Sequence, residues 1–268
     1  MCENKELPVL DNIREKIMVL PGHLGMYYKN LATGLEYSVR GDEAFLAASV
    51  IKFPLFLHIL KENAAGRIDL DQKLVVEEHE KMPSCGALTL FTGPVKADIR
   101  TLCRLMIDIS DNTATNKLIN FCTIEGANAG FRAMGLEETV LRRLLFDGKA
   151  SAAGLENTIC PREMGMLLES LYRGAFVDPE TSRFAMEVLL QQQIDHKLNG
   201  KLCDAVPVAH KTGEDTRLSN DVGLIFAEQP FVLCFAGHDT DVYPWEDLIR
   251  QAAYDLVRIQ GDNKEAVL

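Results

Sequence analysis

Strong β-strand patterns occur only near the two ends of this 268-residue chain, and the long stretch between them has the pattern of helices. Near the N-terminus, residues 26–29 and 35–39 are predicted as two strands around a connection, residues 30–34, that contains a glycine. Three more strands are predicted near the C-terminus, at 206–210, 221–227 and 231–236. If the early and late strands share one sheet, the end of the chain must return to the place where it began.

Amphipathic helices are predicted at both termini and through the middle of the chain. Leu10, Ile13 and Ile17 repeat at helical spacing, and a second repeat runs from Trp245 to Ile259. We expect these terminal helices to cover one sheet. The resulting α+β architecture has a discontinuous sheet domain, residues 1–58 and 187–268, and an all-helical domain, residues 59–186.

A serine and a lysine three residues apart, Ser49 and Lys52, open an apolar stretch that is predicted to be helical. At this spacing the two side chains share one face of a helix. A serine hydroxyl is a poor nucleophile until a base takes its proton. A neutral lysine can be that base if burial and a nearby positive charge lower its pKa. Taken alone, the pair is better explained as an N-cap serine followed by a solvated lysine.

A second motif, S-D-N, occupies residues 110–112. Ser110 and Asn112 are two residues apart, so both can face a cleft in an extended or turn conformation. Alternatively, the same residues form a turn that caps the following helix.

The third motif is K-T-G at residues 211–213. Lys211 and Thr212 combine a cation with a hydroxyl and could hold a carboxylate. Gly213 has no side chain, so substrate atoms could lie against the strand there.

In this order, the three motifs resemble those of the class A β-lactamases, a branch of the penicillin-recognising serine hydrolases. The resemblance covers nearly the whole chain and implies a five-stranded antiparallel sheet flanked by terminal helices, plus a helical lobe. It also implies an acyl-enzyme at Ser49, a proton relay through Ser110 and a substrate amide bound by Asn112. The backbone N–H of Glu214 would be the second oxyanion donor, and Lys211 would hold a carboxylate of a β-lactam or peptide-like small molecule. Glutaminases of a related fold share only the S-x-x-K motif.

One part of the class A pattern is missing. These enzymes carry a glutamate, within R-x-E-x-x-L-N, that activates the water for deacylation. Counting back without a gap from Asn157 places Arg142 at the arginine and Leu144 at the glutamate. Leucine cannot accept a proton, so we expect slow deacylation unless Asp147 or Glu156 replaces the missing base.

The sequence therefore predicts a serine hydrolase that forms an acyl-enzyme and releases it slowly. Two alternatives use the same fold: a penicillin-binding or sensor protein that acylates without significant turnover, and an esterase or peptidase. A structural relic without chemistry is disfavoured by the three intact motifs.

Composition and charge indicate which partners and which cellular location to expect. A net charge of −11 without a basic stripe argues against nucleic acid, and no apolar run is long enough for a membrane span. Seven cysteines without a C-x-x-C pair give no sign of a zinc site or a disulfide framework, and we expect no cofactor. Residues 1–6 do not resemble a signal peptide, so we expect a cytoplasmic protein, or a secreted one if a leader was removed.

Overall fold

The computed structural model describes residues 5–203 and 206–261, so residues 1–4, part of the segment used for the leader expectation, lie outside it. Its main sheet has five strands in the order β2-β1-β9-β8-β7, and all neighbours are antiparallel. The strands are β1 (His23–Asn30), β2 (Glu36–Val39), β7 (Val208–Asp215), β8 (Leu218–Ile225) and β9 (Phe231–His238). The predicted return of the chain to its first strands is confirmed by the pairing of β1 with β9.

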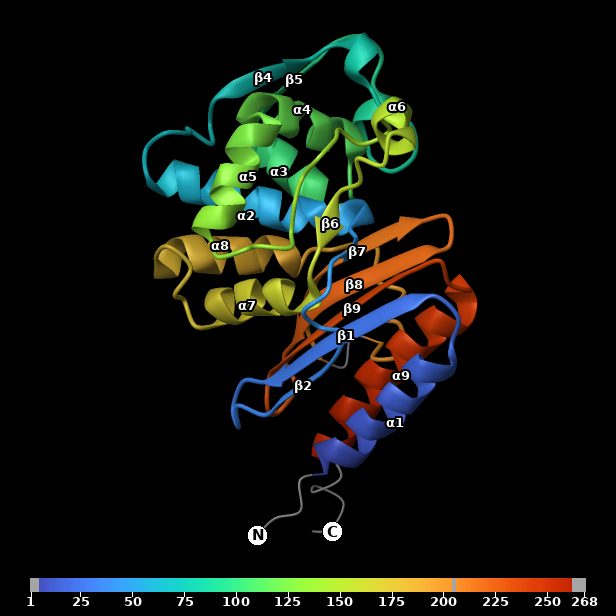
Figure 1. The fold of residues 1–268 in the computed structure, drawn as a ribbon. Coiled ribbons are helices and arrows are strands. Elements are labelled where there is room, and N and C mark those ends of the chain that lie inside the picture. The colour runs from blue at the N-terminus through green and yellow to red at the C-terminus, as the bar shows by residue number, and fades with distance from the viewer. Residues whose placement is uncertain (1–4, 204–205, 262–268) are drawn as a thin grey trace.

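Two terminal helices, α1 (Glu6–Val19) and α9 (Val242–Gly261), lie side by side on one face of this sheet (Figure 1). Leu10, Ile13 and Ile17 of α1 are buried there, as the helical repeat predicts. On α9, Trp245 is fully buried and packs edge-on against a phenylalanine of β9. The terminal helices thus form one outer layer, and the sheet separates them from the other helices.

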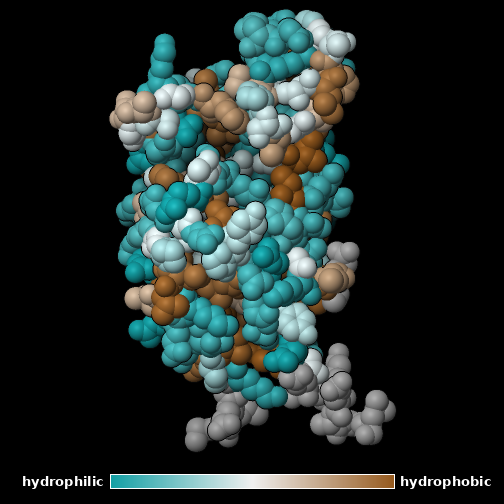
Figure 2. Space-filling view, turned by 90° about the vertical axis from the view of Figure 1, so that its right-hand side faces the viewer, coloured by the Kyte–Doolittle hydropathy of each residue, from teal (hydrophilic) through white to brown (hydrophobic). Residues whose placement is uncertain are grey.

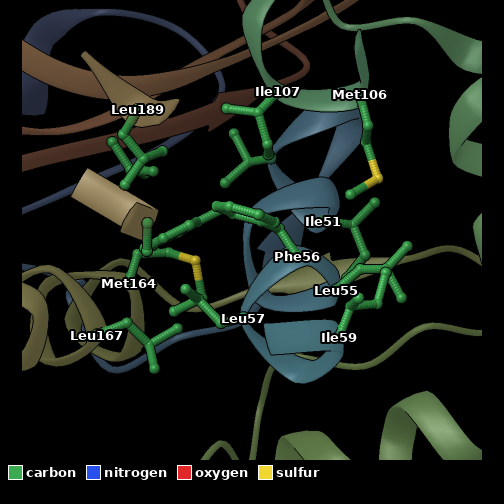
Figure 3. Close-up of a cluster of buried hydrophobic side chains, with 14 of the residues drawn as sticks. Ile51, Leu55, Phe56, Leu57, Ile59, Met106, Ile107, Met164, Leu167 and Leu189 are labelled. Atoms are coloured by element: carbon green, nitrogen blue, oxygen red, sulfur yellow. The ribbon is translucent and has the colours of Figure 1, made fainter. Parts of the chain in front are cut away.

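The remaining helices lie on the opposite side of the sheet (Figure 1). They are α2 (Lys52–Ala64), α3 (Ile99–Asp108), α4 (Asn112–Cys122), α5 (Ile124–Ala133), α6 (Gly148–Ala152), α7 (Pro161–Tyr172) and α8 (Pro179–Leu189), with 3₁₀ turns η1 (Ala48–Ile51), η2 (Glu78–Glu80) and η3 (Leu88–Leu90). The central helix α2 is apolar around most of its circumference and is buried from Lys52 to Leu60. Figure 3 shows Phe56 of this helix among side chains from α3, α7 and α8. The packing holds α2 in one position, and Lys52 with it.

Short strands interrupt the segment that the sequence predicts to be all helical. β4 (Lys73–Val76) pairs with β5 (Val95–Asp98), and β6 (Thr158–Ile159) pairs with β3 (Phe45–Leu46). Strands of two to four residues are too short for alternation to stand out in a sequence. In addition, one hydrophobic cluster contains residues of both predicted domains. The division into two domains stays a prediction.

The surface of the molecule is mixed. On the face seen in Figure 2, hydrophilic residues cover most of the area, and hydrophobic residues form separate patches between them. Within residues 5–203 and 206–261, no helix combines the length and the apolar character that crossing a bilayer requires.

Removing the ring of Phe56 should destabilise the fold strongly, because the side chain is fully buried among three helices. We expect Phe56→Ala to lower the free energy of unfolding by about 3–5 kcal/mol, as measured by urea denaturation. Phe91 is 56% exposed and provides a matched control, so Phe91→Ala should change the same quantity by only about 0.5 kcal/mol. Equal losses in the two variants would contradict this description of the core.

Candidate active site

Ser49 lies in the 3₁₀ turn η1, directly before α2, rather than at the first residue of an α-helix. The preceding Ala48 has a positive φ of 41°, a sparsely populated conformation that often occurs at functional sites. Asn220 of β8 holds this turn, since its Nδ2 donates to the carbonyl oxygens of Leu46 at 2.9 Å and Ala47 at 3.1 Å. The conformation around the serine is therefore fixed from the sheet.

Lys52 is fully buried, and its Nζ is surrounded by acceptors of the S-D-N motif. It donates to Ser110 O at 2.8 Å, Ser110 Oγ at 2.9 Å and Asn112 Oδ1 at 2.8 Å. Burial lowers the pKa of Lys52 well below its usual value, and the charge of Lys211 lowers it further. Both effects favour the neutral amine, the form that can accept a proton.

A second buried amine approaches the same serine from the sheet. Lys211 Nζ lies 3.1 Å from Ser110 Oγ and 2.9 Å from its other acceptor, the carbonyl oxygen of Thr212. Burial, and after it the charge of Lys197, lowers the pKa of Lys211 to about 7. Ser110, whose φ is 57°, therefore places one hydroxyl between two buried amines whose pKa values are both lowered.

Asp111, between the two site residues of its motif, has a structural task. Its buried carboxylate accepts hydrogen bonds from the backbone N–H groups of Ala87 (2.8 Å), Leu88 (2.9 Å) and Ala114 (2.9 Å), and so caps α4. Gly86 is required beside it, because a Cβ there would lie 2.3 Å from the Asp111 Cγ. Both predicted interpretations of S-D-N are compatible: the aspartate caps the helix while its two neighbours face Lys52.

The K-T-G motif lies within β7, which extends to Asp215 and is longer at this end than the predicted strand. A Cβ on Gly213 would lie 2.9 Å from the carbonyl oxygen of Ala47 and 3.1 Å from the backbone nitrogen of Val50. The glycine thus lets β7 pack closely against the η1 turn, a reason that the sequence alone does not give. The next residue, Glu214, is half-exposed.

A cavity of about 720 Å³ opens in front of these residues. Of the predicted site residues, Ser49, Asn112 and Glu214 line it. The others are buried behind its surface: Lys52, Ser110, Lys211, Thr212 and Gly213. The structure therefore gathers the whole predicted set around one cavity, with the serine accessible and the two amines enclosed.

The opposite wall of the cavity comes from the loop between α5 and α7, and it corrects one prediction. Leu145, rather than Leu144, lines the cavity. Asn116 of α4 fixes this register, because its side chain accepts from Leu145 N at 2.8 Å and donates to Leu145 O at 3.0 Å. An ungapped count along the sequence cannot see this contact. Since both residues are leucines, the wall still carries no carboxylate at this point.

The two carboxylates suggested as replacement bases also line the cavity, but both are engaged in the loop. Asp147 accepts from Ala150 N at 3.0 Å and caps α6. Glu156 accepts from Arg143 Nη2 at 2.7 Å and from the hydroxyl of Ser151. Burial alone would raise the pKa of Glu156, but these hydrogen bonds outweigh it and lower the pKa. Glu156 is therefore a weak base in this position.

One group among the described residues has the geometry of a metal site. Ligand atoms of His196, Glu214 and Glu246 all lie within 4.8 Å of one another. However, Lys197 Nζ lies 3.0 Å from Glu214 Oε1, so an ammonium group already supplies positive charge to this cluster. The arrangement fits an ion-pair network better than a metal centre.

Comparison with known proteins agrees with this geometry. A family model described as the β-lactamase enzyme family matches residues 9–260. The chain belongs to that family. It therefore has the fold of a β-lactamase-family serine hydrolase, and the expected resemblance is confirmed.

Relatives in this family share about a quarter of their residues with the chain. A β-lactamase of Rhodobacter capsulatus is 29% identical over 227 residues, which are 83% of this chain and 77% of that protein. A β-lactamase structure from Sphaerobacter thermophilus has a TM-score of 0.86 and 24% identity, over 95% of this chain and 97% of that one. A mutant of PBP-A in which glutamate replaces a leucine, solved as an acyl-enzyme with penicillin G, has a TM-score of 0.86 and 27% identity, over 96% and 97%. The predicted fold class is confirmed by these neighbours.

Three residues that shape this β-lactamase-family site were not predicted from the sequence: Asn116, Lys197 and Asn220. Each acts through contacts with residues distant along the chain, such as Asn220 with Leu46, which is 174 positions away. Asn220 follows the K-T-G motif closely, so a search near the motif could have found it. Nothing in the local pattern around Lys197 distinguishes it from a surface lysine.

Removing the charge of Lys211 should raise the pKa of Lys52, because that charge is one of the two causes that lower it. We expect Lys211→Met to move the NMR titration of the Lys52 side chain to higher pH. Lys96 on β5 is exposed and remote from the site, so Lys96→Met is the control and should leave the titration in place. An unchanged Lys52 titration in Lys211→Met would show that the two amines are not coupled.

Proposed function

We propose that this protein is a serine hydrolase that forms an acyl-enzyme at Ser49 and releases it slowly. Its substrate would be a β-lactam, or a related amide or ester, that carries a carboxylate. The observation that carries the proposal is the buried chain of polar contacts from Lys52 through Ser110 to Lys211, beside an accessible serine. The membership of the β-lactamase family supports it.

Acylation would begin with proton transfer from the Ser49 hydroxyl to neutral Lys52. The serine oxygen then attacks the substrate carbonyl carbon, and the C–N or C–O bond to the leaving group breaks. The proton would pass from Lys52 to Ser110 and on to the leaving nitrogen or oxygen. A distance of 2.9 Å between Lys52 Nζ and Ser110 Oγ supports this relay.

Stabilisation of the oxyanion would come from backbone N–H groups. The N–H of Ser49, at the start of the η1–α2 segment, and the N–H of Glu214, on the edge strand β7, are the donors implied by the family resemblance. Lys211 and Thr212 would hold the substrate carboxylate. A bound carboxylate would also favour the charged form of Lys211, whose pKa is about 7 in the free protein.

Deacylation needs a base that activates water, and the cavity is lined by a leucine, Leu145, in the loop where the family resemblance implies a glutamate. Asp147 and Glu156 are occupied as a helix cap and an ion-pair partner. We therefore propose a long-lived acyl-enzyme. A penicillin-binding or sensor protein is the second candidate, favoured by the likeness to PBP-A, whose leucine-to-glutamate mutant forms an acyl-enzyme with penicillin G. A peptidase or esterase is the third, and the choice among them rests on turnover.

Covalent labelling tests the acyl-enzyme at Ser49. Intact-mass analysis after mixing with penicillin G or an activated ester should show one added acyl group, and a chromogenic cephalosporin should give a burst followed by weak steady-state hydrolysis. Ser49→Ala should remove the added mass and the burst. Ser84 lines the same cavity, so Ser84→Ala is the matched control and should label normally. Labelling that persists in Ser49→Ala would refute the assignment of the nucleophile.

A carboxylate in place of Leu145 should speed deacylation. We expect Leu145→Glu to raise the deacylation rate constant by about 10²-fold, the usual contribution of a positioned general base. Leu145→Gln has the same size without the basic group and should remain slow. The measurement is the decay of the penicillin acyl-enzyme followed by mass.

Fast turnover by the wild type would contradict slow deacylation. If that turnover were lost in Asp147→Asn or Glu156→Gln, the affected carboxylate would be a relocated base.

A further inference from the structure

Lys197 is a buried lysine outside the three motifs. It lies in the segment between α8 and β7, and its side chain is 0% exposed. Its Nζ lies near four oxygen atoms, all on the β7–β8 hairpin: Gly213 O (3.3 Å), Ser219 Oγ (3.1 Å), Asn220 O (3.0 Å) and Glu214 Oε1 (3.0 Å). A lysine ammonium has three donors, so these acceptors use all of them. Lys197 therefore has no donor left for a substrate and acts on the hairpin itself.

The contact of Lys197 with Gly213 O affects the Glu214 N–H, the expected oxyanion donor. The carbonyl of Gly213 and the N–H of Glu214 belong to one peptide unit, which is planar, and no peptide bond in the described residues is cis. In a trans peptide these two groups point in opposite directions. Pairing of β7 with β8 already orients this peptide, and a donor on its oxygen restrains the direction of the N–H further.

Charge adds to this geometric effect. A cation at the carbonyl oxygen draws electron density from the peptide group, and its N–H becomes a stronger donor. The surroundings keep this interaction strong, because Lys197 is enclosed and the local dielectric is low. The same ammonium is also paired with the side chain of Glu214, the residue whose N–H is concerned.

The position of Lys197 is itself fixed from two sides. The next residue, Leu198, donates its backbone N–H to Asp221 Oδ2 at 3.0 Å, which ties the segment to β8. Ser219, a contact of the lysine, donates to Glu246 Oε1 of α9 at 2.8 Å. The ammonium therefore reaches the hairpin from an anchored segment.

We propose that Lys197 is a positioning residue that aims and strengthens the Glu214 N–H as a donor to the oxyanion. This inference rests on the proposed acylation of Ser49. This role can be told apart from binding of the substrate carboxylate. A residue that positions the oxyanion donor changes the rate constant of acylation and leaves the dissociation constant of the substrate nearly unchanged.

The test compares Lys197→Met, which keeps the length of the side chain without its charge, with Lys197→Arg, which keeps the charge. Lys201 lies in the same segment and pairs with Asp247 at 3.1 Å, away from β7, so Lys201→Met is the matched control. Stopped-flow acylation by penicillin G separates the acylation rate constant from the dissociation constant. Infrared spectroscopy of the acyl-enzyme measures the stretch of its ester carbonyl, which rises in frequency when the oxyanion donors weaken.

Loss of an oxyanion donor costs about 10²–10³ in rate, so weakening one should cost about tenfold. We expect Lys197→Met to lose about tenfold in the acylation rate constant and to show a higher carbonyl frequency, with an unchanged dissociation constant. Lys197→Arg should recover part of both effects, and Lys201→Met should equal the wild type. If Lys197→Met does not fold, Lys197→Gln takes its place, with the same result expected.

Two failures are distinguishable. A folded neutral variant with the wild-type acylation rate and carbonyl frequency overturns the role of Lys197 and leaves the proposed function intact. The proposal is also overturned if acylation slows only because the dissociation constant of penicillin G increases, while the carbonyl frequency is unchanged. That result assigns Lys197 to substrate binding. A wild type that is not acylated at all refutes the proposed function, and with it the premise of the inference.

Discussion

Two buried lysines that share one serine hydroxyl set the main constraint on this structure. Lys52 of α2 and Lys211 of β7 approach Ser110 Oγ to 2.9 and 3.1 Å. Buried amines are tolerated only where acceptors surround them, and they tend to lose their charge. The acceptors come from the turn between α3 and α4 and from β7, so helix, turn and sheet must meet at one point. The close approach of β7 to η1 at Gly213 is part of that meeting.

A feature of the fold or the site could be predicted when residues close together in the sequence determine it. Features that depend on contacts between distant segments could not. The terminal helices and the strands near the chain ends were predictable, since α1 carries a helical repeat and β9 is a continuous apolar run. The pair β4 and β5 was missed because the two short strands lie far apart along the chain, without the short glycine-containing connection that marks β1 and β2. Counting along the sequence pointed to Leu144, whereas Leu145 lines the cavity, where a side chain of α4, Asn116, holds its backbone. The contacts of Lys197 depend on the folded hairpin and have no local signature.

The motifs combine residues of two kinds, and only the structure separates them. In S-D-N, Ser110 and Asn112 contact Lys52, whereas Asp111 binds three backbone N–H groups and holds the loop at Gly86. In K-T-G, the glycine serves the packing of β7 against η1. A motif can therefore be intact for reasons of architecture, and its presence alone does not establish chemistry. For the proposed chemistry, the distances from the two lysine amines to the Ser110 hydroxyl are stronger evidence than the presence of the motifs.

The polar groups on the two sides of the cavity differ in the contacts that they make. On the side of α2 and β7, the fold holds Lys52, Ser110 and Lys211 in contact with one another. On the side of the loop, Asp147 and Glu156 line the cavity, but Asp147 Oδ1 caps α6 and both oxygens of Glu156 accept from Arg143 and Ser151. Freeing either carboxylate to activate water would remove the contacts that hold it at the cavity. Under the proposed mechanism, a base for deacylation would therefore be an additional group, best placed at Leu145, whose backbone Asn116 already fixes.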